Sequence, residues 1–139
     1  MALDEKVRQE SVRRRLERSE EEYQDFLDLR GAKPRKAVIG AYGSVYNATH
    51  ALFIEFERTV KNPKSNQSLI KAFHNEFVHT GLFAKKFAAI LNRALSLRND
   101  GVYDEEFDLT EENLNDLDDH ISRFNREVKR IIGEHQNQA

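Results

Sequence analysis

A short polar segment in the second half of the chain carries residue types that bind phosphate. Arg98 is followed directly by Asn99, and Tyr103 comes five residues after the arginine. The arginine guanidinium is a rigid planar fork of donors that suits phosphate oxygens. The segment also has a structural interpretation, because Arg in the last turn favours the helix dipole and Asn-Asp-Gly is common in turns. Tyr103 would then cover the end of the helices.

Several other kinds of chemistry are excluded or disfavoured by the residues. The chain has no Cys, which excludes disulfides, zinc-thiolate sites, iron–sulfur clusters and a cysteine nucleophile. His74 and His79 are five residues apart, whereas two helical ligands share a face at a spacing of three or four. Gly40 and Gly43 lie in a helical pattern without a preceding strand, so they do not form a phosphate loop. We therefore predict no metal and no cofactor.

The charges are distributed unevenly along the chain. The net charge is −2, but residues 31–99 carry 11 basic and 3 acidic side chains, and residues 100–139 carry 4 basic and 12 acidic ones. The basic block can meet an external polyanion, or it can meet the acidic block within one chain or between two chains. Internal pairing is the simpler interpretation.

Length and composition predict one domain over residues 1–139. Apolar residues make up 39% of the chain and charged residues 33%, which is typical of helices with wide polar faces. The apolar runs are only a few residues long, so no membrane span is expected. The N-terminus is charged and lacks an apolar signal core. We expect a soluble, cytoplasmic protein.

The apolar spacing is helical, and Pro34 and Pro63 lie in polar breaks. The predicted fold class is all-α, with residues 1–30 as an N-terminal helix and 134–139 as a frayed tail. The pattern places the helices at residues 4–29, 34–60, 67–79, 82–99 and from 110 onward. Thr110 is expected to cap the last helix, and Asn99-Asp100-Gly101 to end the fourth.

Two rows of residues predict packing. The last helix carries an unbroken apolar stripe, which is expected to pack against Phe87 and Ile90: Leu114, Leu117, Ile121, Phe124, Val128, Ile131. The second helix carries small residues at Gly40, Ser44 and Ala48. Glycine destabilises a helix by about 1 kcal/mol relative to alanine, so close approach of another helix is the expected reason for this row.

Three pieces of the chain, in order, resemble small stand-alone HEPN-domain proteins, the higher eukaryote and prokaryote nucleotide-binding family. The first is Ala-Tyr-Gly-Ser-Val-Tyr-Asn-Ala at 41–48. The second is Lys-Ser-Asn-Gln-Ser-Leu-Ile at 64–70, followed by Phe-Val-His-Thr-Gly-Leu at 77–82. The third is Leu-Asn-Arg-Ala-Leu-Ser-Leu-Arg-Asn at 91–99, followed by Tyr103 and an acidic loop. The resemblance spans residues 40–124.

The resemblance implies an up-and-down bundle of four long helices and a shorter one that pairs as a homodimer. It also implies a possible partner, a minimal nucleotidyltransferase, in a toxin–antitoxin-like pair. Ribonuclease members of the family carry Arg, then a polar residue, and a His four to six residues after the Arg. Arg98 and Asn99 match, but Tyr103 stands in place of the His, as in one branch of the family.

Three functions remain open at this point. The first is a nucleotide- or RNA-binding module, with contacts from Arg98, Asn99 and Tyr103 and from Tyr42, Tyr46 and Asn47. The second is a metal-independent ribonuclease that uses Arg98 and Tyr103. The third is a structural interaction protein whose dimer serves assembly. Whichever function holds, the predicted homodimer interface lies near the second helix, at Gly40, Ser44 and Ala48, and near the segment from Arg98 to Tyr103. The module is preferred over the ribonuclease because Tyr, with a reference pKa of about 10, is a poor base at neutral pH.

Overall fold

The computed structural model describes residues 2–60, 62 and 65–138, and these residues form helices without any strand. The predicted all-α class is therefore confirmed, while the up-and-down HEPN arrangement stays a prediction. The elements are α1 (Ala2–Leu29), α2 (Pro34–Glu55), α3 (Asn66–Phe73), the π-helical segment η1 (His74–Val78), α4 (Lys85–Tyr103) and α5 (Glu111–Asn137). Among the described helices, none is both long and apolar enough to cross a bilayer.

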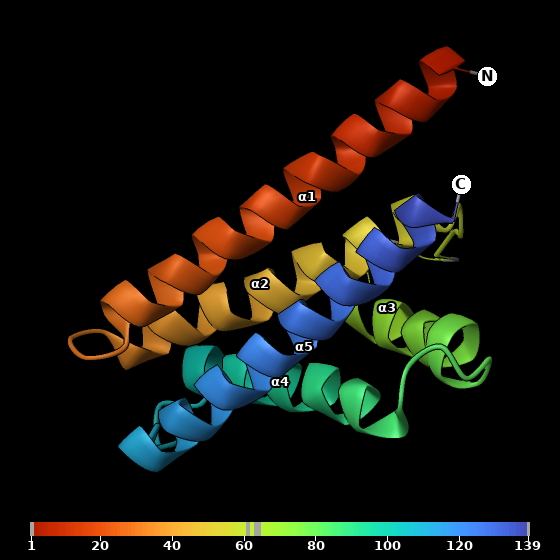
Figure 1. The fold of residues 1–139 in the computed structure, drawn as a ribbon. Coiled ribbons are helices and arrows are strands. Elements are labelled where there is room, and N and C mark those ends of the chain that lie inside the picture. Colours follow the sequence, from red (N-terminus) through yellow and green to blue (C-terminus); the bar gives the residue numbers. More distant parts are fainter. Residues whose placement is uncertain (1, 61, 63–64, 139) are drawn as a thin grey trace.

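Helix α2 is the central element, because it packs against α1, α4 and α5. Figure 1 shows α1 and α2 side by side and joined at one end, with α5 crossing in front of α2 and α4. Two helix starts follow the sequence signals. Pro34 occupies the first turn of α2, and the Thr110 hydroxyl accepts a hydrogen bond from the Asn113 amide at the start of α5.

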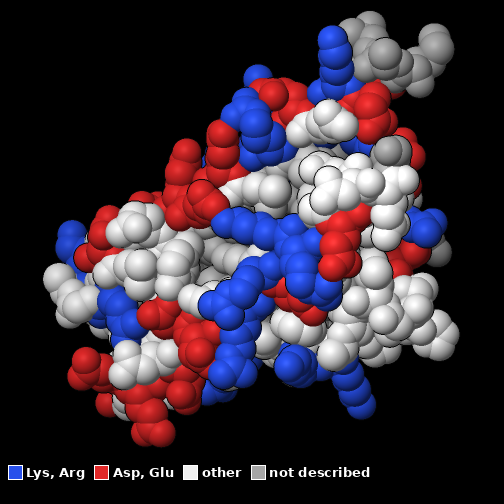
Figure 2. All heavy atoms as spheres, viewed as in Figure 1, with Lys and Arg blue, Asp and Glu red and all other residues white. Residues whose placement is uncertain are grey.

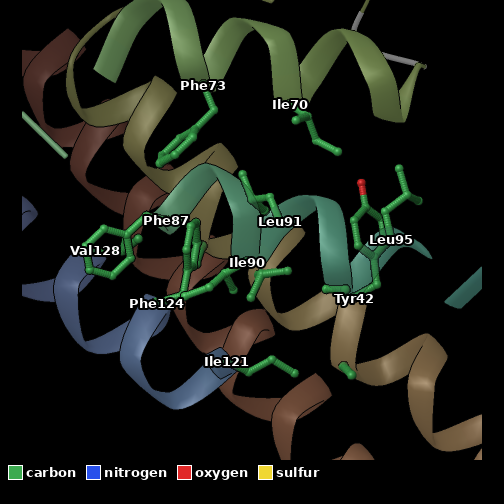
Figure 3. Close-up of a cluster of buried hydrophobic side chains, with 14 of the residues drawn as sticks. Tyr42, Ile70, Phe73, Phe87, Ile90, Leu91, Leu95, Ile121, Phe124 and Val128 are labelled. Carbon is green, nitrogen blue, oxygen red and sulfur yellow. The ribbon is translucent and has the colours of Figure 1, made fainter. Parts of the chain in front are cut away.

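The core forms where α3, α4 and α5 meet α2. All six residues of the predicted α5 stripe are buried, and so are Phe87 and Ile90, which confirms this part of the prediction. Phe124 lies between two other rings, with centroids 5.7 Å from Phe73 and 6.3 Å from Phe87 (Figure 3). Aromatic pairs at these separations add to the burial of apolar surface.

Two predicted helix ends are wrong. Helix α2 ends at Glu55 rather than at residue 60, and Glu57 has a positive φ of 53°. Helix α4 does not end at Asn99-Asp100-Gly101 but continues to Tyr103. A Cβ at Gly101 would lie 2.9 Å from a Val38 methyl carbon, so this glycine serves close packing rather than helix termination.

The predicted frayed tail at 134–139 is also wrong for the residues that the structure describes. Helix α5 continues to Asn137 because side chains of its last turn form hydrogen bonds with a buried carboxylate. The Glu55 side chain, 1% exposed, contacts His135 Nδ1 at 2.6 Å and accepts a hydrogen bond from Gln136 Nε2 at 2.9 Å. Arg8 Nη1 of α1 lies 3.3 Å from the same carboxylate and donates to the Glu55 carbonyl at 2.6 Å. We call this group the Glu55 node.

The small-residue row of α2, predicted as a dimer interface, is buried against α1 within the chain, while the homodimer stays a prediction. A Cβ at Gly40 would lie 2.7 Å from the Glu22 carbonyl oxygen of α1. The Ser44 hydroxyl donates to the Ser19 carbonyl at 2.8 Å, and Ala48 is fully buried. The expected close approach of another helix is present, and that helix is α1.

Candidate functional site

Arg98 lies in a cleft of about 430 Å³ that four helices enclose. The Arg98 side chain comes from α4, and the other lining residues come from α1, α2 and the start of α3. The lining residues are Arg15, Arg18, Glu22, Ile39, Tyr42, Gly43, Tyr46, Asn47, Asn66 and Arg98. The guanidinium carbon of Arg98 lies 5.7 Å from the centre of the Tyr42 ring. This cation–π contact holds Arg98 over α2 while the guanidinium keeps its donors.

An aromatic row on α2 forms one wall of the cleft. Tyr42 and Tyr46 are four residues apart, so they share a helix face, and their ring centres are 5.9 Å apart. Tyr42 is buried, and its hydroxyl donates to Asn66 Oδ1 at 2.9 Å. Burial raises the pKa of Tyr42 to about 12. Tyr42 is therefore a protonated donor at neutral pH, and the half-buried Tyr46 is the ring that a ligand can reach.

Side chains of α1 form the opposite wall. Arg15 Nη1 donates to Asn47 Oδ1 at 2.8 Å, and Asn47 Nδ2 donates to the Gly43 carbonyl at 2.9 Å. This chain of hydrogen bonds orients Arg15 across the helix boundary. Arg18 stands at the rim, 68% exposed, with Nε 3.6 Å from a Glu22 carboxylate oxygen.

Glu22 is the one acidic residue among the cleft residues. Burial raises its pKa, against the opposing effect of Arg18. A Cβ at Gly43 would overlap the Glu22 carboxylate, so the glycine makes room for this side chain. The cleft therefore combines three arginines with one carboxylate whose charged form is disfavoured.

Two of the three arginines are held by neutral groups. Arg15 bonds Asn47, and Arg98 Nη1 donates to Asn99 Oδ1 at 3.1 Å. Neither arginine forms an ion pair within the described residues. An anion that enters the cleft can therefore accept charge-assisted hydrogen bonds from them without displacing a carboxylate.

A second hollow continues the cleft along α1. It is lined by Ser11, Arg14, Arg15, Arg18, Asn47 and Ile54, so it shares two arginines and Asn47 with the cleft. Arg14, 75% exposed and with Nε 3.3 Å from a Glu10 carboxylate oxygen, adds a further guanidinium at its far end. The cationic surface is longer than one phosphate group needs.

The structure brings together four of the predicted site residues and separates two. Arg98, Tyr42, Tyr46 and Asn47 line the same cleft. Asn99 contacts Arg98 but does not line the cleft. Tyr103 is 74% exposed and lies outside it. Because α4 stays helical, five residues turn the side chain by about 140° relative to Arg98.

Four residues of the cleft were not predicted from the sequence: Arg15, Arg18, Glu22 and Asn66. Arg15, Arg18 and Glu22 are spaced by three and four residues, which places them on one face of α1. The same spacing fits an exposed helix with internal ion pairs. Only the packing of α1 on α2 shows that this face meets the tyrosines.

His50 is a histidine on α2 near the cleft but not among its lining residues. Its ring centre lies 4.5 Å from that of Tyr46. Burial, with a smaller contribution from Arg15, lowers the pKa of His50 to about 4. The Nε2 atom is buried and has no hydrogen-bond partner in the part of the chain that the structure describes. His50 is thus neutral at pH 7 and one helical turn beyond Tyr46.

No protein-family model and no curated protein matches the chain, so the resemblance to HEPN-domain proteins stays a prediction from the residues.

Proposed function

We propose that the Arg98 cleft binds the phosphate groups of single-stranded RNA or of a nucleotide. The observation that supports the proposal most strongly is that Arg15 and Arg98 form no ion pair with a carboxylate within the described residues. Both guanidiniums face one cleft, and both are held by asparagine oxygens rather than by carboxylates. A phosphate there receives donors from two sides, in the fork geometry that arginine provides.

The aromatic wall gives the ligand a second feature to recognise. Tyr46 is half-buried beside the arginines, and a nucleobase can stack on such a ring. Tyr42 is too buried to stack a base, and its hydroxyl is already engaged with Asn66. In this proposal Tyr42 positions Arg98, while Tyr46 contacts the base.

The length of the cationic surface favours a strand over a mononucleotide. Arg98 stands on α4, and Arg15, Arg18 and Arg14 follow along α1 through the second hollow. A single strand carries one phosphate per nucleotide, so several of its phosphates can contact such a groove. Its affinity then depends strongly on salt.

The cleft residues support binding better than cleavage. Cleavage through the RNA 2′-hydroxyl needs a base for its proton and an acid for the leaving oxygen. No histidine lines the cleft, and Tyr42 with a pKa of about 12 is a poor base. The alternative function, a metal-independent ribonuclease, would have to use Glu22, whose raised pKa brings it nearer to neutral pH. A minimal nucleotidyltransferase as partner remains part of the proposal only through the family resemblance.

The test measures binding and cleavage in the same samples. Fluorescein-labelled single-stranded RNA and labelled AMP are titrated in EDTA with wild type, Arg98→Ala, and Arg93→Ala as the control. Arg93 is an exposed arginine of α4 outside the cleft, so both variants lose one charge. We expect Arg98→Ala to weaken RNA binding about tenfold or more, and Arg93→Ala to weaken it less than about threefold.

Three outcomes would change the conclusion. Equal losses in both variants would show general charge attraction and would contradict a site at Arg98. RNA cleavage that disappears in Arg98→Ala and Glu22→Gln would favour the ribonuclease. AMP binding as tight as RNA binding would restrict the ligand to a nucleotide.

A further inference from the structure

The outward face of α5 carries six charged residues in a single row. They are spaced by four, three, four, three and four residues: Glu112, Asp116, Asp119, Arg123, Arg126, Arg130. This spacing keeps them on one helix face, opposite the buried stripe that contains Ile121. All six are exposed. We call this row the α5 charge row.

The α5 charge row is acidic in its first half and basic in its second. Figure 2 shows the same change on the viewed face: red where α5 begins at the lower left, and blue over the middle of the molecule. By the rise of a helix, the row is about 27 Å long. A row of this kind has a positive and a negative end on the surface of one element.

The two halves mirror each other with opposite sign about Ile121. Asp119 and Arg123 lie two residues either side of it, Asp116 and Arg126 five, and Glu112 and Arg130 nine. A second copy of α5 laid antiparallel on this face, with a two-fold axis at Ile121, therefore places an acid opposite a base at each position. The symmetry doubles the three pairs to six.

The contacts within the chain leave the row available. Asp119 and Arg123 pair along the helix at 3.2 Å, with both side chains 58% exposed, and Arg130 pairs with Glu127 and Glu134. Such exposed pairs along a helix are weak and exchange readily. Among the described residues, Glu112, Asp116 and Arg126 form no ion pair.

A groove beside the two-fold position adds apolar surface. It lies between α4 and α5, has a volume of about 460 Å³, and is lined by Lys86, Phe87, Ala89, Ile90, Arg93, His120 and Arg123. His120 and Arg123 flank Ile121 on α5, so a second copy seated on the charge row would cover this groove. Charge complementarity then sets the register of the pair, and burial of the groove contributes to its affinity.

We propose that two copies of this chain associate through antiparallel α5 helices, with the α5 charge row as the matching element. The interface differs from the one predicted at Gly40, Ser44 and Ala48, which α1 covers. No α5 residue lines the Arg98 cleft, so each copy keeps its cleft open in the pair. The proposal does not depend on what the cleft binds.

The test is a charge reversal in which each half of the row is changed separately. Sedimentation velocity at about 50 mM salt, where exposed charges are weakly screened, compares wild type with Asp116→Arg and Arg126→Glu. Each single reversal places like charges opposite each other twice, and we expect it to weaken self-association at least tenfold. Controls with the same change in net charge are Asp28→Arg and Lys71→Glu, at exposed positions off the row; they should associate as wild type does.

Two rescues make the test specific for this geometry. A one-to-one mixture of D116R and R126E carries complementary charges at both positions, so the mixture should associate although neither variant does alone. The double variant D116R/R126E should again form a homodimer. A wild type that stays monomeric at low salt up to about 500 μM, single variants that associate unchanged, or a mixture that fails to associate would each overturn the proposal.

Discussion

Two polar sites lie along α2, the Glu55 node at one end and the Arg98 cleft nearer the other, and they differ in how their charges are paired. At the node, the buried Glu55 carboxylate contacts Arg8, His135 and Gln136, so its oxygens are engaged within the chain. In the cleft, Arg15 and Arg98 donate hydrogen bonds to asparagine oxygens, Arg98 lies over the Tyr42 ring, and neither forms an ion pair among the residues that the structure describes. A charge whose partners are all internal holds helices together, whereas a charge held by neutral groups can still bind an ion.

The largest expected effect is on stability at the Glu55 node. Glu55→Ala removes the buried carboxylate that Arg8, His135 and Gln136 contact, while Arg8 keeps its ion pair with Glu5. The loss of these hydrogen bonds to a charged group costs about 3 kcal/mol. We expect the free energy of unfolding, measured in urea, to fall by that amount. Glu21→Ala, at an exposed position of α1, is the control and should change it by less than about 0.5 kcal/mol. A node variant as stable as this control would remove the distinction between the two sites.

The next effect separates binding from stability at the cleft. Arg98→Ala removes a half-buried side chain that carries no ion pair in the described residues, so the free energy of unfolding should change by less than about 1 kcal/mol. The affinity for single-stranded RNA should fall by about 1.5–3 kcal/mol, the usual contribution of a hydrogen bond to a charged group. Unfolding in urea and fluorescence anisotropy measure the two quantities. A variant that loses stability and keeps its affinity would reverse the roles of cleft and node.

A smaller effect tests the helix contact that forms the cleft. Gly40→Ala places a Cβ 2.7 Å from the Glu22 carbonyl, where backbone must move, and we expect a net loss of about 1–2 kcal/mol in the free energy of unfolding. Gly133→Ala is the matched control, because nothing lies within 4 Å of its Cβ, and it should stabilise α5 by about 0.5–1 kcal/mol. If both substitutions stabilised the protein, α1 would not pack closely on α2.

The smallest effect concerns pH, at a residue between the two sites. His50 has a pKa of about 4 in the folded protein, below its ordinary value of 6.5, so between these values the unfolded chain binds more protons. The free energy of unfolding should therefore fall as pH decreases from about 6.5 toward 4, by about 1 kcal/mol once solvent screening is allowed for. Urea unfolding at pH 7 and pH 5 should show a steeper loss for wild type than for His50→Gln. Equal losses, or a His50 titration by NMR near pH 6.5, would contradict this.

The sequence predicts the helices and core better than the site. The patterns that indicate helices and core involve residues near one another in the sequence, whereas the site depends on contacts between distant residues. The α5 stripe repeats over six residues, so its burial follows from helical periodicity alone. Gly101 shows the opposite case: in sequence it suggests a helix end, but in the fold it gives room to Val38, which is distant along the chain. Because α4 continues through Gly101 to Tyr103, the helical rotation per residue points the Tyr103 side chain away from Arg98.

The Arg98 cleft is only half predictable for the same reason. Arg98, Tyr42, Tyr46 and Asn47 have residue types that suit a nucleic acid, and the structure places them together. Arg15 has the same type as the neighbouring Arg13, which forms exposed ion pairs with Glu10 and Glu17. What distinguishes Arg15 is its hydrogen bond to Asn47, 32 positions away. No local pattern contains that information.

The most direct test of RNA binding at the Arg98 cleft is an NMR titration of the isotope-labelled protein with a short single-stranded RNA. If the Arg98 cleft binds the RNA, the amide shifts of Gly43, Asn47 and Arg98 and of the α1 residues near Arg15 change. The amide shifts of Glu55, His135 and Tyr103 stay in place. The changes should be lost in Arg98→Ala and should weaken with salt. Shifts confined to the α4–α5 groove or to the Glu55 node, or the same shifts in Arg98→Ala, would contradict RNA binding at the Arg98 cleft.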